Sequence, residues 1–169
     1  MIYPIVKYGN PLLEKPAEPV TAFDGDLKKL VEDMFESMYA AHGVGLAAPQ
    51  IGISKRLAVI DVTFKEDPDA KLVIANPEII KTEGRHTQSE GCLSVPEFRE
   101  QVTRARKVTI RAQDINGKWF EKTGDDLLAR AFLHETDHLN GKLYISHISV
   151  IKRDFMKRKI RKLMKAGEW

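Results

Sequence analysis

The residues with the clearest chemical potential are His134, Glu135 and His138, which form the pattern H-E-x-x-H within the segment HETDH. On a helix, residues four positions apart lie on one face, so both imidazoles can reach a single metal ion. The carboxylate of Glu135 would lie beside them, where it can accept a proton from a water that the metal activates. The pattern is short, and two ordinary histidines without a metal are the plain alternative.

A catalytic metal site needs a third protein ligand. The longer protease pattern H-E-x-x-H-x-x-G-x-x-H would place it at Tyr144, and neutral tyrosine is a poor ligand. His147 is a second option, although it lies beyond the expected end of the helix. Cys92, the only cysteine, offers a thiolate in the segment EGCLS. A lone cysteine is more often a small buried hydrophobic residue, but beside an H-E-x-x-H pattern without a third ligand the metal-binding interpretation is favoured.

A third segment, GVGLAAPQ at residues 43–50, superficially matches the dinucleotide fingerprint G-x-G-x-x-[GA]. That fingerprint requires a strand before it and a helix after it. Here a predicted helix precedes the segment and Pro49 interrupts it, so nucleotide binding is excluded. The two glycines allow close approach of a ligand to the backbone, and Gln50 adds a polar amide. A tight helix-to-strand connection with a surface glutamine is the alternative.

Together, the segments at 43–50, 90–94 and 134–138 resemble the three signature motifs of the peptide deformylases, in the family's order and at its approximate spacing. The resemblance implies removal of the N-formyl group from the N-terminal methionine of nascent polypeptides, with release of formate. It also implies one divalent metal ion per chain. Fe(II) is the expected native metal, Zn(II), Ni(II) or Co(II) can occupy the site, and the implied ligands are Cys92, His134 and His138.

The same resemblance implies roles for further residues. Glu135 would act as general base and then return its proton to the departing amine. The Gln50 side-chain amide and the Leu93 backbone N–H would bind the developing oxyanion. The peptide would lie extended along Val44 and Gly45 by strand addition. Its methionine side chain would enter an apolar pocket, for which the candidates are Val44, Leu127 and Ala131.

The resemblance assigns no catalytic role to three charged residues near these motifs, and for Asp137 it implies a structural role. Arg130 interrupts an otherwise apolar helix at a position where an apolar pocket residue is expected. It should either face solvent or alter the rim of the pocket. Asp137, between the two histidines, should either form an orienting salt bridge, with Arg104 as a partner, or be a solvated helix charge.

These motifs must be positioned by an α+β fold, because helix signals flank a run of strand and hairpin signals without βαβ alternation. The expected architecture has mostly antiparallel sheets packed around a central helix that carries the H-E-x-x-H motif, followed by a C-terminal helix. Helices are expected from Asp24 or Asp26 to about His42, ended by Gly43, and from Asp125 or Asp126 to Leu139, with Gly141 as the stop. Strands are expected at 57–62, 72–75, 78–81, 107–112 and 118–123.

Composition limits the class of protein. A chain of 169 residues with 43% hydrophobic and 30% charged residues suits one ordinary globular domain. No apolar run approaches the ~20 residues that span a bilayer, and no secretory signal is visible. The single cysteine excludes an intrachain disulfide. These features predict a cytoplasmic protein that does not associate with membranes.

The net charge of +3 is unevenly distributed, because residues 152–169 carry +6 and the rest of the chain −3. We therefore expect a catalytic domain at 1–151 and a basic helical tail at 152–169. One interpretation docks the tail on the domain through a stripe of apolar residues and leaves its basic face solvated. The other has the basic face bind the ribosome electrostatically. The residues of the stripe are Ile151, Phe155, Ile160, Leu163 and Met164.

Two other functions are compatible with parts of the sequence. A metalloprotease would explain the H-E-x-x-H motif, although Tyr144 at the third-ligand position counts against it. A non-catalytic RNA- or ribosome-binding module with a structural metal would explain the basic tail. Glu135 and Gln50 beside the ligand motifs have no purpose in such a closed structural site.

Overall fold

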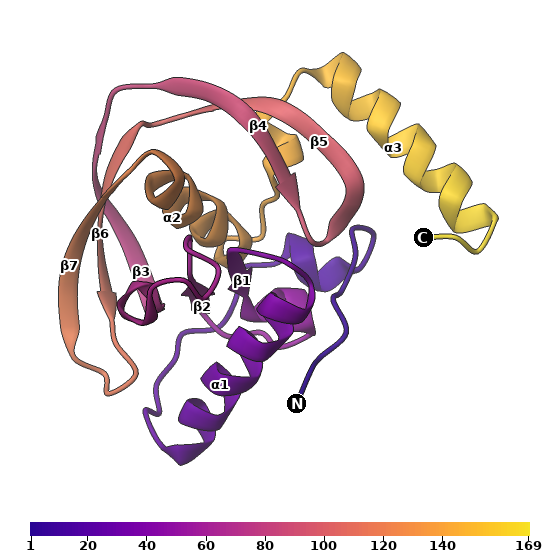
Figure 1. Ribbon diagram of the computed structural model, residues 1–169. Coiled ribbons are helices and arrows are strands. Elements are labelled where there is room, and N and C mark those ends of the chain that lie inside the picture. The colour runs from indigo at the N-terminus through magenta and orange to yellow at the C-terminus, as the bar shows by residue number, and fades with distance from the viewer.

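The computed structural model describes residues 1–169. Helix α2 (Asp126–Leu139) lies at the centre, enclosed by two antiparallel sheets (Figure 1). This confirms the expected α+β fold, in which the sheets surround the helix that carries the H-E-x-x-H motif. The larger sheet has the order β1-β2-β3-β6-β7 and the smaller one pairs β4 with β5. The strands are β1 (Gly45–Ala47), β2 (Leu57–Ile60), β3 (Leu72–Glu83), β4 (His86–Cys92), β5 (Val95–Arg104), β6 (Lys107–Gln113) and β7 (Trp119–Asp125).

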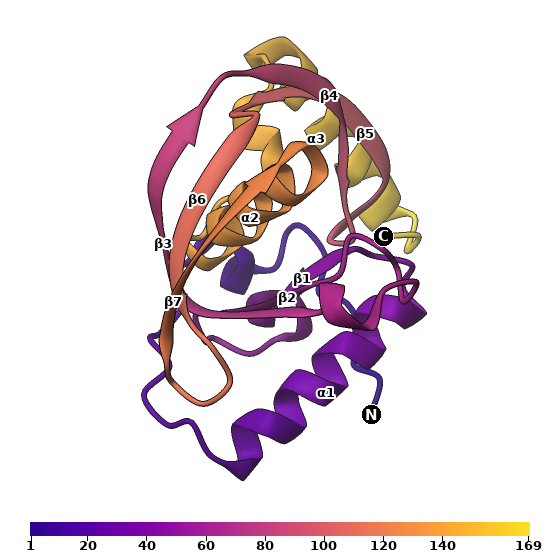
Figure 2. The ribbon, with the colours of Figure 1, turned by 60° about the vertical axis from the view of Figure 1, so that its left-hand side comes forward.

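Helix α1 (Gly25–Ala40) and α2 cover opposite sides of β1 and β2 (Figure 2). Because side chains alternate along a strand, Leu57 and Val59 pack on the α1 side, whereas Ala58 and Ile60 pack on the α2 side. All four are fully buried. The continuous apolar sequence LAVI is therefore the sequence of a strand with a hydrophobic layer on each face.

The expected helix boundaries are close to the observed ones. Asp24 caps α1 by accepting the Leu27 N–H at 3.0 Å. The helix ends at Ala40, and His42, with φ 60°, adopts the left-handed conformation that Gly43 was expected to supply. Helix α2 ends as predicted, since Gly141 beyond its last turn has φ 78°.

The two strands expected at 72–75 and 78–81 are one strand, β3, with an irregularity between Ala75 and Glu78. Asn76 has φ 49°, and its side chain donates to the Val20 carbonyl at 2.9 Å and accepts the Val20 N–H at 2.9 Å. The turn signal of Asn76 and Pro77 therefore marks a bulge, at which the Asn76 N–H donates to the Arg56 carbonyl at 2.8 Å while its side chain binds Val20. The hairpin of β6 and β7 agrees with the prediction.

Strands β1, β4 and β5 were not predicted from the sequence. Strand β1 has only three residues, too few to show a period. Strands β4 and β5 are mostly polar, and charged residues such as Glu90 and Arg104 occupy buried positions, so their sequences lack the apolar alternation of a half-buried strand. This second sheet nevertheless carries Cys92 at the end of β4.

The C-terminal helix α3 (Val150–Lys165) forms as expected, but the predicted apolar stripe is only partly correct. Met156 and Ile160 dock the helix against the third hydrophobic cluster, together with the partly buried Trp169. Ile151 and Phe155 are 82% and 59% exposed, because they share a face that points away from the domain. None of the helices combines the length and apolar character needed to cross a membrane.

Candidate active site

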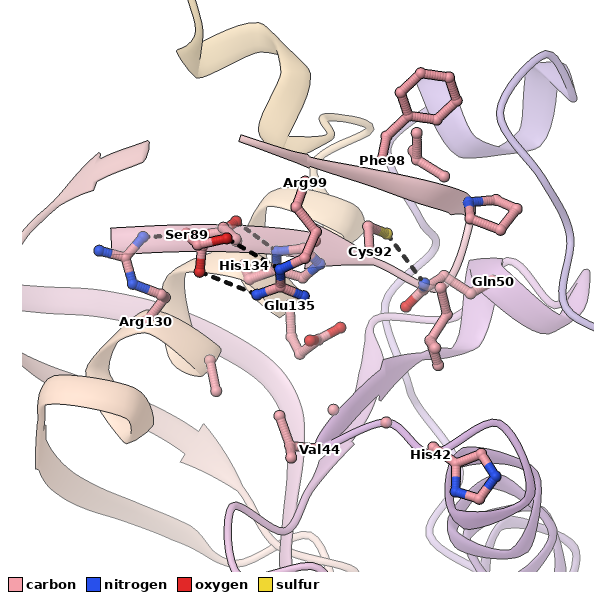
Figure 3. A pocket seen from close by; sticks show the side chains of 18 of the residues that line it. His42, Val44, Gln50, Ser89, Cys92, Phe98, Arg99, Arg130, His134 and Glu135 are labelled. Atoms are coloured by element: carbon pink, nitrogen blue, oxygen red, sulfur yellow. Dashed lines mark hydrogen bonds and ion pairs between the residues drawn. The ribbon is translucent and has the colours of Figure 1, made fainter. Parts of the chain in front are cut away.

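The structure brings together the three residues that the sequence motifs indicated as metal ligands. His134 projects from α2, and Cys92 approaches from the end of β4 (Figure 3). His138 lies one turn after His134 on the same face of α2. Cys92 Sγ lies 3.3 Å from His138 Nε2, which lies 3.2 Å from His134 Nε2. The three donor atoms lie within 4.8 Å of one another. One thiol sulfur and two imidazole nitrogens converging in this way form a donor set that fits Zn(II) or Fe(II).

The thiol of Cys92 is electrostatically prepared for this role. Burial would raise its pKa, but the imidazoles of His138 and His134 outweigh burial and lower the pKa to about 5. The thiolate, which is the form that binds metals, is thus favoured at neutral pH.

Glu90 fixes the orientation of His134. Its Oε2 lies 2.7 Å from His134 Nδ1, so Nδ1 carries the proton and Nε2 presents its lone pair toward Cys92 and His138. Burial would raise the pKa of Glu90, but hydrogen bonds from Arg104 and His134 hold it well below its usual range. The carboxylate is therefore ionised when it receives these donors. This role was not predicted, although Glu90 is part of the EGCLS segment.

Asp137 forms the orienting salt bridge that was one of its two expected roles. Its Oδ2 lies 3.0 Å from Arg104 Nη1 and 2.8 Å from His147 Nε2. The second contact engages His147 with Asp137, outside the convergent donor set. Tyr144 is fully buried and its hydroxyl faces Met156 Sδ at 4.0 Å.

Glu135 lies between the metal-ligand cluster and β1. Its side chain is almost fully buried, burial raises the pKa of its carboxyl group, and Oε1 has no hydrogen-bond partner. A Cβ atom on Gly45 would lie 2.5 Å from Glu135 Oε2. A side chain at position 45 would clash with the Glu135 carboxylate, so the close approach of β1 and α2 at this point requires glycine.

Gln50 is buried rather than on the surface. It lies in a short 3-10 turn (Ala48–Ile51), where its Oε1 accepts the Ala47 N–H at 3.0 Å. This contact fixes the amide so that Nε2 faces Ser94 Oγ at 3.2 Å and Cys92 Sγ at 3.5 Å. Leu93 follows Cys92 in the tight connection between β4 and β5, and its backbone N–H makes no hydrogen bond within the protein.

The N-terminal segment that contains Val6 and Tyr8 forms backbone hydrogen bonds with both of these loops. The Val6 N–H donates to the Gln50 carbonyl at 2.7 Å, and the Tyr8 N–H donates to the Ser94 carbonyl at 2.7 Å. The loop that carries Gln50 and the loop that follows Cys92 are therefore joined through a third, extended piece of chain.

A cavity of about 630 Å³ opens beside these groups. All four residues expected to bind substrate line it: Val44, Gly45, Leu127 and Ala131. Leu127 is half exposed at its rim. Further lining residues on the β4–β5 side were not predicted, because no motif marks them: Ser89, Glu97, Phe98 and Arg99.

One of the two expectations for Arg130 is wrong: the residue is only 4% exposed, so it does not face solvent. Arg130 does line the cavity, and an effect on the pocket stays a prediction. Its Nη1 donates to Glu90 Oε1 at 2.8 Å. A buried guanidinium requires such a partner, and the partner lies forty positions earlier in the chain, which local sequence cannot reveal.

Comparison with known proteins identifies this arrangement. The family model described as polypeptide deformylase matches residues 2–154. The chain belongs to this family. A peptide deformylase of Acidobacterium capsulatum is 63% identical over 169 residues, which cover 100% of this chain and 99% of the relative. The crystal structure of a deformylase from Legionella pneumophila has a TM-score of 0.91 at 47% identity and covers 99% of this chain and 98% of that chain.

A deformylase from Thermus thermophilus has a TM-score of 0.90 at 40% identity, covering 99% of this chain and 98% of that chain. The deformylase fold thus extends over the whole chain, α3 included. The protein is a metal-dependent hydrolase that removes the N-formyl group from the N-terminal methionine of nascent polypeptides. Family membership supports neither the protease nor the non-catalytic binding module.

Proposed function

We propose that Cys92, His134 and His138 hold one divalent metal ion, with Fe(II) as the native metal and Zn(II), Ni(II) or Co(II) as replacements. The convergence of Sγ and the two Nε2 atoms within 4.8 Å carries this proposal. When bound, the ion supplies Lewis-acid activation of a water molecule for attack on the formyl carbon. Three protein ligands leave a coordination position open, as catalysis requires.

Glu135 is the proton carrier of the proposed mechanism. Its raised pKa and unpartnered Oε1 suit a group that takes a proton from the attacking water and then gives it to the departing amine. The C–N bond of the formamide breaks as that proton arrives. The products are formate and a free N-terminal amine.

Gln50 and Leu93 are the proposed donors to the formyl oxygen as negative charge develops on it. Gln50 Nε2 has two N–H groups and contacts Ser94 Oγ at 3.2 Å and Cys92 Sγ at 3.5 Å. Because sulfur is a weak acceptor, the N–H that faces Cys92 can turn to an oxygen acceptor. The Leu93 N–H has no competing partner in the protein. Loss of one such donor costs on the order of 10²–10³ in rate.

Strand β1 is the proposed docking edge for the peptide. It is an edge strand of the larger sheet, paired with β2 on one side only. An extended peptide can add to its free edge along Val44 and Gly45. The methionine side chain then enters the adjoining cavity beside Leu127 and Ala131.

The decisive experiment combines metal analysis with a formate-release assay under anaerobic conditions. Glu135→Gln should retain the metal, because Glu135 is not in the donor set, while kcat falls by about 10³-fold. Cys92→Ala should lose the metal as well as activity. A Glu135→Gln enzyme that releases formate at the wild-type rate would contradict the proposed mechanism.

We also propose that the enzyme acts in the cytoplasm and that α3, which contains most of the basic tail 152–169, binds the ribosome. The helix exposes Arg158 and Lys162 together with Ile151 and Phe155, a basic surface with apolar contacts. Arg158→Gln with Lys162→Gln should weaken sedimentation with ribosomes in a salt-dependent way and preserve activity on short peptides. The matched control neutralises two exposed lysines of the β6–β7 hairpin, Lys118 and Lys122. Equal binding by both double variants would contradict the proposal.

A further inference from the structure

Arg130 is a buried charge that the proposed mechanism does not use. Its side chain is 5% exposed, and its guanidinium is engaged by three acceptors. Nη1 donates to Glu90 Oε1 at 2.8 Å and to the Val102 carbonyl at 3.0 Å, while Nη2 donates to the His86 carbonyl at 3.2 Å. The guanidinium is thus fixed between β4, β5 and α2.

Glu90 receives four charge-assisted hydrogen bonds. Oε1 accepts from Arg130 Nη1 and Arg104 Nε, each at 2.8 Å. Oε2 accepts from Arg104 Nη2 at 2.8 Å and lies 2.7 Å from His134 Nδ1. Because both arginines hold Oε1, the carboxylate cannot rotate, and Oε2 stays in place for His134.

The two arginines differ in one respect. Arg130 lines the cavity beside Leu127 and Ala131, and Arg104 does not. Figure 3 shows Arg130 at the α2 side of this cavity, with its guanidinium directed away from Val44. Because the guanidinium is held by Glu90 and by two backbone carbonyls, the aliphatic stem of Arg130 is left to line the cavity, where Glu90 is also a lining residue.

We propose that Arg130 is a positioning residue whose guanidinium holds Glu90 behind His134 and whose stem forms a wall of the pocket for the methionine side chain. The inference rests on the metal ligands and the pocket proposed above. It predicts that one residue governs both metal retention and side-chain preference, whereas Arg104 governs metal retention alone.

The first test measures zinc affinity by competition with a chromogenic chelator. Arg130→Met, which keeps a stem but removes the charge, should weaken zinc binding about 10-fold, the lower end for loss of a partner that orients a metal ligand. Arg130→Lys should recover part of this loss. In a Glu90→Gln background, Arg130→Met should cause no further loss, because it acts through Glu90. Wild-type affinity for Arg130→Met, or an undiminished effect in that background, would overturn the positioning role.

The second test compares kcat/KM for formyl-Met and formyl-Phe peptides in zinc-saturated enzyme. Arg130→Ala removes the stem and should lower the preference for methionine about 10-fold, the scale of a pocket contact. Arg104→Met should leave the preference unchanged. An unchanged preference in Arg130→Ala would refute the proposal that the Arg130 stem forms a wall of the methionine pocket. Thermal unfolding checks that each variant folds. If Arg130→Met or Arg130→Ala does not fold, the zinc affinity and the methionine preference of Arg130→Lys decide the two tests.

Failure of the underlying function would look different. Wild-type enzyme would then release no formate, or Cys92→Ala would retain zinc, whatever residue stands at position 130. Wild-type activity combined with unchanged affinity and preference in the Arg130 variants would refute only the role of Arg130.

Discussion

Two regions of this enzyme are rich in charge, and they use it in opposite ways. Around Glu90, the side chains of Arg104 and Arg130 are no more than 5% exposed and are paired with carboxylates. On α3, most basic residues are exposed, and Lys152, which pairs with Glu100 at 3.1 Å, is itself 56% exposed. The buried charges are held in fixed positions, where they orient a proposed metal ligand. The exposed charges of α3 are solvated and contribute only to the electrostatic potential around the helix.

The energetic difference follows from solvation. Removing one partner of a buried pair leaves an uncompensated charge and costs about 3–5 kcal/mol. An exposed pair contributes about 0–1 kcal/mol, because water and salt screen it. Substitutions matched in chemistry can therefore separate the two regions.

The largest effect is expected for Glu90→Gln. It leaves Arg104 and Arg130 without their shared anion, so the free energy of unfolding should fall by about 3–5 kcal/mol. Glu100→Gln is the matched control, since its partner Lys152 is 56% exposed and Glu100 itself 25% exposed, and it should cost less than about 1 kcal/mol. Urea denaturation of the two variants measures both values. Similar losses would show that burial does not distinguish the regions.

A smaller effect is expected from pH. Burial would raise the pKa of Asp137, but hydrogen bonding to His147 and the charge of Arg104 lower it. A carboxylate with a lowered pKa contributes stability above its unfolded-state pKa, and this stability is lost as the pH falls through the folded-state pKa. The stability of the enzyme should thus decline below about pH 4.

Asp137→Asn should flatten this acid decline, as measured by urea denaturation between about pH 6 and about pH 3. Arg158→Gln on α3 is the control and should not change the slope, because arginine does not titrate in this range. An equally steep decline in Asp137→Asn would show that Asp137 is not one of the responsible groups.

The smallest effect is expected for Arg158→Gln combined with Lys162→Gln. Both side chains are exposed and have no carboxylate partner within salt-bridge distance, so stability should change by about 0.5 kcal/mol or less. Thermal unfolding at low and high salt measures this. A loss of several degrees would mean that the basic face of α3 also supports the fold.

The same contrast explains what sequence could predict. The spacing of His134 and His138 imposes a shared helical face, and an unpaired cysteine in a second motif completed the proposed ligand set. The Asp24 cap of α1 and the β6–β7 hairpin follow from equally local rules. The core of the fold and the centre of the site were therefore predictable.

What was missed depends on distant partners. Arg130 contacts Glu90, which is forty positions away in the sequence, and the residues near Arg130 give no indication of that contact. The β4–β5 sheet lacks an apolar period, because some of its buried positions carry charged residues, Glu90 and Arg104, whose partners are distant in sequence. On α3, the choice of Met156 rather than Phe155 as the docking residue depends on which face the preceding turn presents to the domain.

The segment that contains Val6 and Tyr8 affects the conformational entropy that the active site loses when it binds a peptide. By bonding to the carbonyls of Gln50 and Ser94, it immobilises two loops before any peptide arrives. The entropy of ordering the proposed oxyanion donors is then lost during folding rather than at each turnover. An irregular stretch of chain with no catalytic side chain thereby keeps the reorganisation energy of the active site small.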